Sequence, residues 1–78
     1  MLFDYSKLRG RIAEKFKSRK ALADFIGMTT TALSNRLNGK VSFKPEEIMA
    51  ICAPDCLDIA PEEVHVYFFA LEVLKVEP

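Results

Sequence analysis

Four short polar side chains in the middle of the chain have the types and spacing to read hydrogen-bonding groups on a ligand. They are Thr30, Thr31, Ser34 and Asn35. An asparagine amide can pair bidentately with the edge of an adenine, and a threonine offers a hydroxyl together with a methyl that can contact the methyl of thymine. Short polar side chains also coat solvated helix faces, so the four residues taken alone do not favour a binding role.

The elements that position them lie in residues 18–40, which are predicted to fold as two short helices joined by a glycine turn. Ser18 can cap the first helix, because its hydroxyl can accept a hydrogen bond from a free amide of the first turn. Gly27 stands where this helix must end in a left-handed residue, a conformation that glycine adopts at little cost. Thr29 can cap the second helix, which ends at Asn38-Gly39. The apolar faces of the two helices hold Ala21, Leu22, Phe25 and Ile26, and Ala32, Leu33 and Leu37.

Two short helices joined in this way form a helix-turn-helix motif. The stretch resembles the Cro/repressor family of phage helix-turn-helix proteins, called XRE-type in bacteria, and the small size of the chain resembles Cro proteins. The resemblance covers roughly residues 5–68. The chain departs from the family's pattern at Arg19, where glutamine is common, and at Arg36, where an apolar residue is common. The matching residues are Leu22-Ala23, Ile26-Gly27-Met28, Leu33 and Asn38-Gly39-Lys40.

The resemblance implies an all-α fold, a five-helix lambda-repressor-like DNA-binding domain with a short C-terminal tail or strand. Residues 1–68 would form the domain, with the motif at residues 19–38, and residues 69–78 would form the tail. The resemblance also implies contacts in the major groove, with base edges contacted by Thr30, Thr31, Ser34 and Asn35. Phosphates would be contacted by Arg19, Lys20, Thr29, Arg36, Asn38 and Lys40, with Arg11 as a further candidate.

The charges are divided unequally along the chain, although the formal net charge is zero. Residues 1–44 hold ten basic and three acidic side chains, whereas residues 45–78 hold one basic and eight acidic side chains, so the two parts carry +7 and −7. Such asymmetry indicates one side that faces a polyanion and one that faces away. Acidic residues also favour the first turns of helices, which explains part of the acidic excess but not the basic one.

Apolar spacing and two prolines predict the remaining helices. Leu8, Ile12 and Phe16 repeat every four residues and give the first helix a core face. Within it, Gly10 is expected to permit the close approach of another helix, which is the commoner use of such a glycine, or else of a phosphate. A proline suits the first position of a helix, where its missing amide would go unpaired anyway. Two further helices are therefore predicted, one from Pro45 with the core stripe Ile48, Met49, Ile51 and Cys52, and one from Pro61 with Val64, Tyr67 and Phe68 inward.

The last stretch, residues 69–77, is predicted to be an extended tail or strand. Its large apolar side chains exceed what so small a core can bury, and an exposed apolar patch usually marks an interface. The candidate dimerisation residues are Phe69, Leu71 and Val73. The alternative is that the tail folds back onto the first helix of the same chain and covers Leu2, Phe3 and Tyr5.

Other functional classes find little support in the composition. Cys52 and Cys56 lie four apart, but a zinc site needs four ligands and the only histidine is His65, so no metal or cofactor is expected. The sequence has no serine–histidine–carboxylate set and no glycine-rich phosphate loop, which argues against an enzyme. No apolar run is long enough to span a bilayer, and no signal peptide precedes the domain, so a cytoplasmic protein is expected.

Two hypotheses follow. The first is a sequence-specific transcriptional regulator, a phage or prophage Cro-like repressor that binds double-stranded operator DNA as a homodimer. The second is a protein-binding modulator of the antirepressor or antitoxin type, which acts on a partner repressor or a toxin. The apolar tail and the acidic part of the chain are compatible with the second hypothesis. A gel-shift assay with the DNA that flanks the gene would separate the two.

Overall fold

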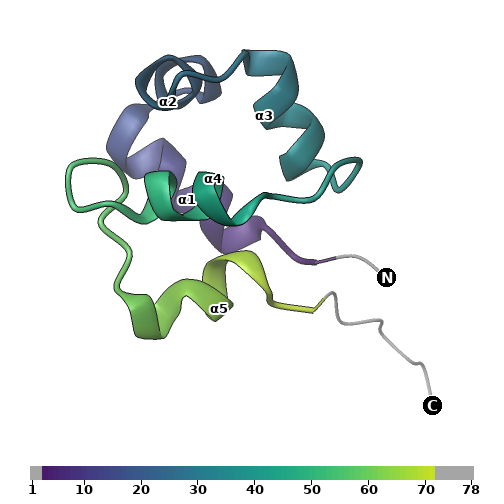
Figure 1. Cartoon of the computed structure of the whole chain (residues 1–78), viewed down its shortest axis with the longest axis vertical. Helices are drawn as coiled ribbons and strands as arrows, with labels where there is room; N and C mark the ends of the chain where they lie inside the picture. Colours follow the sequence, from purple (N-terminus) through teal and green to yellow (C-terminus); the bar gives the residue numbers. More distant parts are fainter. Residues whose placement is uncertain (1–2, 72–78) are drawn as a thin grey trace.

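Five short α-helices form the part of the chain that the computed structural model describes, residues 3–71. The predicted all-α, five-helix fold is therefore confirmed. Figure 1 shows α2 and α3 at one end of the long axis, α5 at the other end, and α1 and α4 between them. None of the helices in residues 3–71 is long and apolar enough to cross a membrane. The elements are α1 (Ser6–Phe16), α2 (Arg19–Ile26), α3 (Thr30–Leu37), α4 (Pro45–Cys52) and α5 (Val64–Phe68), the last preceded by a 3-10 turn at Pro61–Glu63.

The helix-turn-helix has the caps that the sequence predicts. The Ser18 hydroxyl accepts a hydrogen bond from the Ala21 amide at 3.1 Å, and the Thr29 hydroxyl accepts one from the Ala32 amide at 3.0 Å. Gly27 ends α2 in the left-handed conformation, with φ +76°. These local contacts set where α2 ends and α3 begins, and so determine the angle at which α3 leaves the turn.

The core draws apolar side chains from all five helices. Ala23 of α2 is fully buried, and its small side chain lets α2 and α3 approach closely. Burying a large apolar side chain stabilises a fold by about 1.5–3 kcal/mol, so a few such residues hold this small domain together. The large side chains with less than 2% exposure are Leu8, Leu22, Leu33, Leu37, Ile51, Leu57 and Phe68.

Three residues differ from their predicted packing. Phe25 is 51% exposed and contacts the Phe16 ring at a centroid distance of 5.4 Å, so it covers the side of the core instead of filling it. Met49 is 74% exposed, because the core contacts of α4 come from the neighbouring Ile48 and Ile51. Gly10 has no close neighbour, since a Cβ added there would meet nothing within 4 Å. The predicted helix contact at Gly10 is therefore wrong.

The first and last residues that the structure describes contact each other through their backbones. Phe3 and Leu71 form an isolated antiparallel bridge, and the Asp4 amide donates to the carbonyl of Ala70 at 2.6 Å. The rings of Phe3 and Phe69 meet edge to face at 5.6 Å. Residues 69–71 thus pair with the segment that precedes α1, and this is the part of the fold-back alternative that involves Phe3. Leu2 and residues 72–77 of the predicted tail lie outside the described residues. Val73, the third candidate dimerisation residue, lies outside the described residues.

Candidate binding surfaces

The first candidate surface is the side of α3 that carries the predicted base-contacting residues. Thr30 and Thr31 are exposed, whereas Ser34 and Asn35 are half-buried. The Ser34 hydroxyl lies 3.2 Å from an Nη of Arg19, which donates to it, so the first residue of α2 is linked to the middle of α3. The four side chains are thus carried by one short helix, with Thr30 and Thr31 in its capped first turn and Ser34 and Asn35 one turn later.

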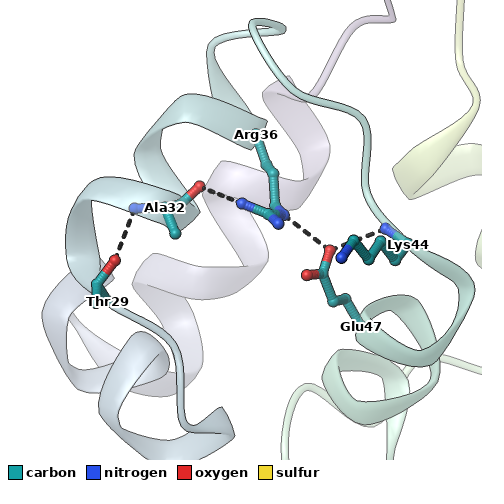
Figure 2. A network of polar contacts seen from close by, with 5 residues as sticks. All are labelled: Thr29, Ala32, Arg36, Lys44 and Glu47. Atoms are coloured by element: carbon teal, nitrogen blue, oxygen red, sulfur yellow. Dashed lines mark hydrogen bonds and ion pairs between the residues drawn. The ribbon is translucent and has the colours of Figure 1, made fainter.

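Arg36 lies in a different environment from the one predicted for a phosphate contact. Its Nε donates to the Glu47 carboxylate at 2.8 Å, and an Nη donates to the Ala32 carbonyl at 3.0 Å. The side chains of Arg36 and Glu47 are only 12% and 15% exposed. Figure 2 shows the Arg36 guanidinium between the Ala32 carbonyl of α3 and Glu47 in the first turn of α4. The guanidinium therefore binds groups within the fold. These bonds explain how a charged residue can occupy a position of α3 that faces another helix and is largely buried.

Glu47 is held in its ionised form by this arrangement. Burial alone would raise the pKa of the carboxyl. The hydrogen bonds from Arg36 and from the Lys44 amide, the latter at 2.8 Å, outweigh that effect and lower the pKa below its ordinary value. The sequence suggests Glu47 only as an acidic residue in the first turn of a helix, and its second role as the partner of Arg36 appears in the structure.

Two further arginines also bind the protein's own backbone. An Nη of Arg9 donates to the carbonyl of Leu37, the last residue of α3, at 2.8 Å. Arg11 donates to the carbonyls of Leu57 and Asp58 at 3.0 and 3.1 Å. Both residues contribute to the basic excess of residues 1–44, and Arg11 is a predicted phosphate candidate. These charges hold helix ends and a loop in place, which reduces the number of cations free to meet a polyanion.

The other predicted phosphate-contacting residues lie at the ends of α2 and α3. Thr29, Asn38 and Lys40 are exposed. Lys20 is exposed and forms an ion pair with Asp24 at 2.9 Å. The structure therefore brings part of the predicted set to the ends of the motif, while Arg36 faces α4.

The second candidate surface is an apolar groove of about 640 Å³ between α4 and the segment that leads into α5. Met49, exposed on α4, and Phe69, which is 49% exposed after α5, both line it. The sequence predicts Met49 in the core, but the structure exposes it. The one signal in the sequence is that the predicted core stripe of this short helix holds four apolar residues, of which Ile48 and Met49 are adjacent and so point in different directions. The groove is lined by Pro45, Ile48, Met49, Cys52, Ala53, Pro54, Asp58, Ile59, Ala60, Pro61, Val64 and Phe69.

Cys52 and Cys56 do not form a chemical site. Both are free, Cys56 is buried and Cys52 is half-buried. Burial raises the pKa of both thiols, which keeps them protonated and unreactive at neutral pH. Within residues 3–71, no group of three histidine, cysteine or acidic side chains is placed to hold a metal ion.

Comparisons with known proteins place the chain in a family. Residues 1–71 match the family model described as "Protein of unknown function (DUF739)". The structure is similar to the solution structure of the modulator of repression (MOR) of the temperate bacteriophage TP901-1 from Lactococcus lactis, with a TM-score of 0.73 and 36% sequence identity over 88% of this chain and 90% of that one. No curated protein sequence matches the chain. With the family model covering nearly the whole sequence, the chain belongs to the DUF739 family, and it is homologous to a phage modulator of repression.

Proposed function

We propose that this protein is a modulator of repression, a small regulator that acts by binding a partner repressor protein. The observation that carries the proposal is its similarity to phage MOR, because the identity of 36% extends over nearly the full length of both chains. This is the second of the two hypotheses drawn from the sequence. The antitoxin variant of that hypothesis receives no support from the comparison.

The distribution of charged and apolar groups supports the same proposal. Arg36 is paired with the Glu47 carboxylate, and Arg9 and Arg11 donate to backbone carbonyls, so fewer arginine N–H groups of residues 1–44 are free to bind phosphates than the composition indicates. Met49 and Phe69, by contrast, expose large apolar surfaces beside one groove. Exposed apolar patches usually mark contacts with other proteins. A regulator that works through protein contact needs such a surface, whereas a DNA reader needs free cations.

Binding to a repressor protein from the genome that carries the gene tests the proposal. The purified full chain and that repressor are mixed and examined by analytical ultracentrifugation, and operator DNA is then added in a gel-shift assay. We expect a complex of the two proteins and a change in the repressor–operator band at chain concentrations that leave free DNA unshifted. The absence of a protein complex, together with a shift of operator DNA by the chain alone, would contradict the proposal.

Direct DNA reading is a second candidate function, favoured by the capped α2–α3 motif with four polar side chains on α3. In this case the chain would bind operator DNA as a homodimer, because one motif reads only a few base pairs. Affinity would fall steeply with salt, with each neutralised phosphate adding about −0.9 to the log–log slope. Lys40→Ala would flatten this slope without changing sequence preference. A salt-independent affinity would exclude this candidate.

A further inference from the structure

We infer that the apolar groove between α4 and α5 binds an amphipathic helix of the partner protein, with apolar side chains along one face and lysines or arginines on its flanks. The inference rests on the proposed function, since it names the surface and the kind of partner through which a modulator would act. It uses residues 45–71, which lie outside the helix-turn-helix.

The groove offers apolar contacts that the fold itself does not use. Met49 projects from α4 with 74% of its surface exposed, although Ile51, two residues later, is fully buried. Phe69 keeps half of its ring surface exposed even after packing against Phe3. Methionine is flexible and polarisable, and it suits surfaces that must adapt to a partner. These two side chains provide anchors in a groove that Ile48 and Val64, which are less exposed, also line.

The charges around the groove select a cationic partner. From residue 45 to residue 71 the chain has six acidic residues and no lysine or arginine. Glu47 is bound by Arg36, while the other five are exposed, namely Glu46, Asp55, Asp58, Glu62 and Glu63. Asp58 lines the groove, and Glu46 and Glu62 directly follow two lining prolines. Two cations border the same region, Arg11 at the backbone carbonyl of Asp58 and Lys44 before Pro45, so the acidic side chains exceed them by three. Such a field attracts basic flanks and repels acidic ones, which gives specificity and speeds association.

The apolar lining of the groove suits one face of a helix. An amphipathic helix binds by laying one apolar face into a groove, with anchors at i, i+3, i+4 and i+7. A peptide that binds by strand addition would instead need an unpaired sheet edge, and within residues 3–71 the only sheet-like pairing is the isolated bridge between Phe3 and Leu71. A volume of about 640 Å³ accommodates several apolar side chains from one helix face.

A defined peptide tests the groove without knowledge of the natural partner. The probe is a synthetic helical peptide of about 15 residues with leucines at i, i+3, i+4 and i+7 and lysines on the flanks, long enough to form a helix when bound. It is titrated into the full, isotope-labelled chain while amide chemical shifts are recorded. We expect the largest shifts at Ile48, Met49 and Val64, and affinity at least about tenfold weaker for a peptide with glutamates in place of the lysines.

Two matched variants locate the contact. Met49→Arg removes an anchor and adds a charge that repels the peptide, and we expect at least about tenfold weaker binding. Phe25→Arg makes a comparable change at an exposed apolar residue of α2, away from the groove, and should leave the affinity unchanged. Circular dichroism checks that both variants are folded. Should Met49→Arg unfold, Met49→Ala removes the anchor without adding a charge and gives the same comparison.

Several results would overturn the inference. They are unchanged affinity in both Met49 variants, equal binding of the two peptides, and chemical shifts confined to α2 and α3. A dimer of the chain that Met49→Arg dissociates would identify a second copy as the occupant instead. Tighter peptide binding after removal of residues 72–78 would identify the chain's own C-terminal segment. Either result would also overturn the inference.

The repressor assay separates this inference from the proposed function. If the wild-type chain and Met49→Arg bind the repressor equally well, the modulator function stands and the groove is not its contact surface. If the wild-type chain binds no repressor, the proposed function is wrong. In that case the lysine peptide still shows whether the groove binds basic amphipathic helices.

Discussion

The guanidinium of Arg36 and the carboxylate of Glu47 lie 2.8 Å apart and join the last turn of α3 to the first turn of α4. Each partner is also anchored in its own element, Arg36 on the Ala32 carbonyl and Glu47 on the Lys44 amide. Figure 2 shows this chain of contacts running from one helix to the next. The orientation of α3 against α4 is therefore held by a directional ion pair as well as by apolar packing.

Removal of either partner should destabilise the fold. We expect Glu47→Ala and Arg36→Ala each to lower the free energy of unfolding by about 1.5–3 kcal/mol, because each leaves a largely enclosed charge without its partner. The double variant should lose less than the sum of the two, which urea denaturation measures. The exposed pair Lys20–Asp24 provides the control, since Asp24→Asn should cost no more than about 0.5 kcal/mol. Additive losses at Arg36 and Glu47 would show that the pair is not coupled.

The same pair should make stability depend on pH in the acid range. The pKa of Glu47 is lowered in the folded protein, so its contribution is fully present above the unfolded value of about 4.3 and is lost as the pH falls through the lower folded value. The difference in unfolding free energy between the wild type and Glu47→Gln should therefore be largest above about pH 5 and should shrink as the solution is acidified. A difference that stays constant down to about pH 2 would contradict the assignment.

Gly10→Ala should stabilise the protein. Gly10 lies inside α1, and the added methyl would meet no atom within 4 Å. The gain should be about 0.5–1 kcal/mol, because glycine loses more conformational freedom than alanine when a helix forms. Gly27→Ala is the opposing control, since its φ of +76° strains any residue with a Cβ and the variant should be less stable. Thermal unfolding followed by circular dichroism measures both changes.

DNA reading by α3 predicts a defined defect for Asn35→Ala. Loss of the amide should reduce discrimination at one base pair by about 1–3 kcal/mol, with the fold intact and phosphate contacts unchanged. Thr30→Ala and Thr31→Ala should act in the same way but more weakly. The measurement is a gel-shift competition between operator variants. If Asn35→Ala of normal stability keeps the wild-type preference, Asn35 does not read a base.

The C-terminal residues can be tested for dimerisation independently of the fold-back contact. Removal of residues 72–78 keeps the bridge between Phe3 and Leu71 and the hydrogen bond of Asp4 to Ala70. If the tail joins two chains, this shortened protein should stay helical but sediment as a monomer where the full chain sediments as a dimer. A shortened chain that is still dimeric would place the interface elsewhere. Removal of residues 69–78, which also deletes the fold-back contact, should in addition lower the melting temperature.

Much of the local structure follows from the sequence alone. The caps at Ser18 and Thr29, the left-handed Gly27 and the helix start at Pro45 depend on contacts within a few residues, and all appear as predicted. At Pro61 a 3-10 turn forms first, and α5 begins at Val64. Apolar spacing likewise identified most of the core. These features are predictable because a helix end is decided by the side chains of its own first or last turn.

The tertiary structure decided which charged and apolar side chains remain free. Arg9 and Arg11 bind carbonyls 28 and 46 residues away, and Arg36 binds a carboxylate 11 residues away. Because these partners are distant in the sequence, the composition does not show that the three arginines bind groups of the fold. Met49 lies in an apolar stripe like its neighbours, yet the packing of α4 leaves it exposed beside the groove. Periodicity shows which residues share a helix face, but the width of the face that is covered depends on how closely other helices approach it. That is why the sequence determined the five helices and the motif, while the groove and the engaged arginines appeared only in the folded chain.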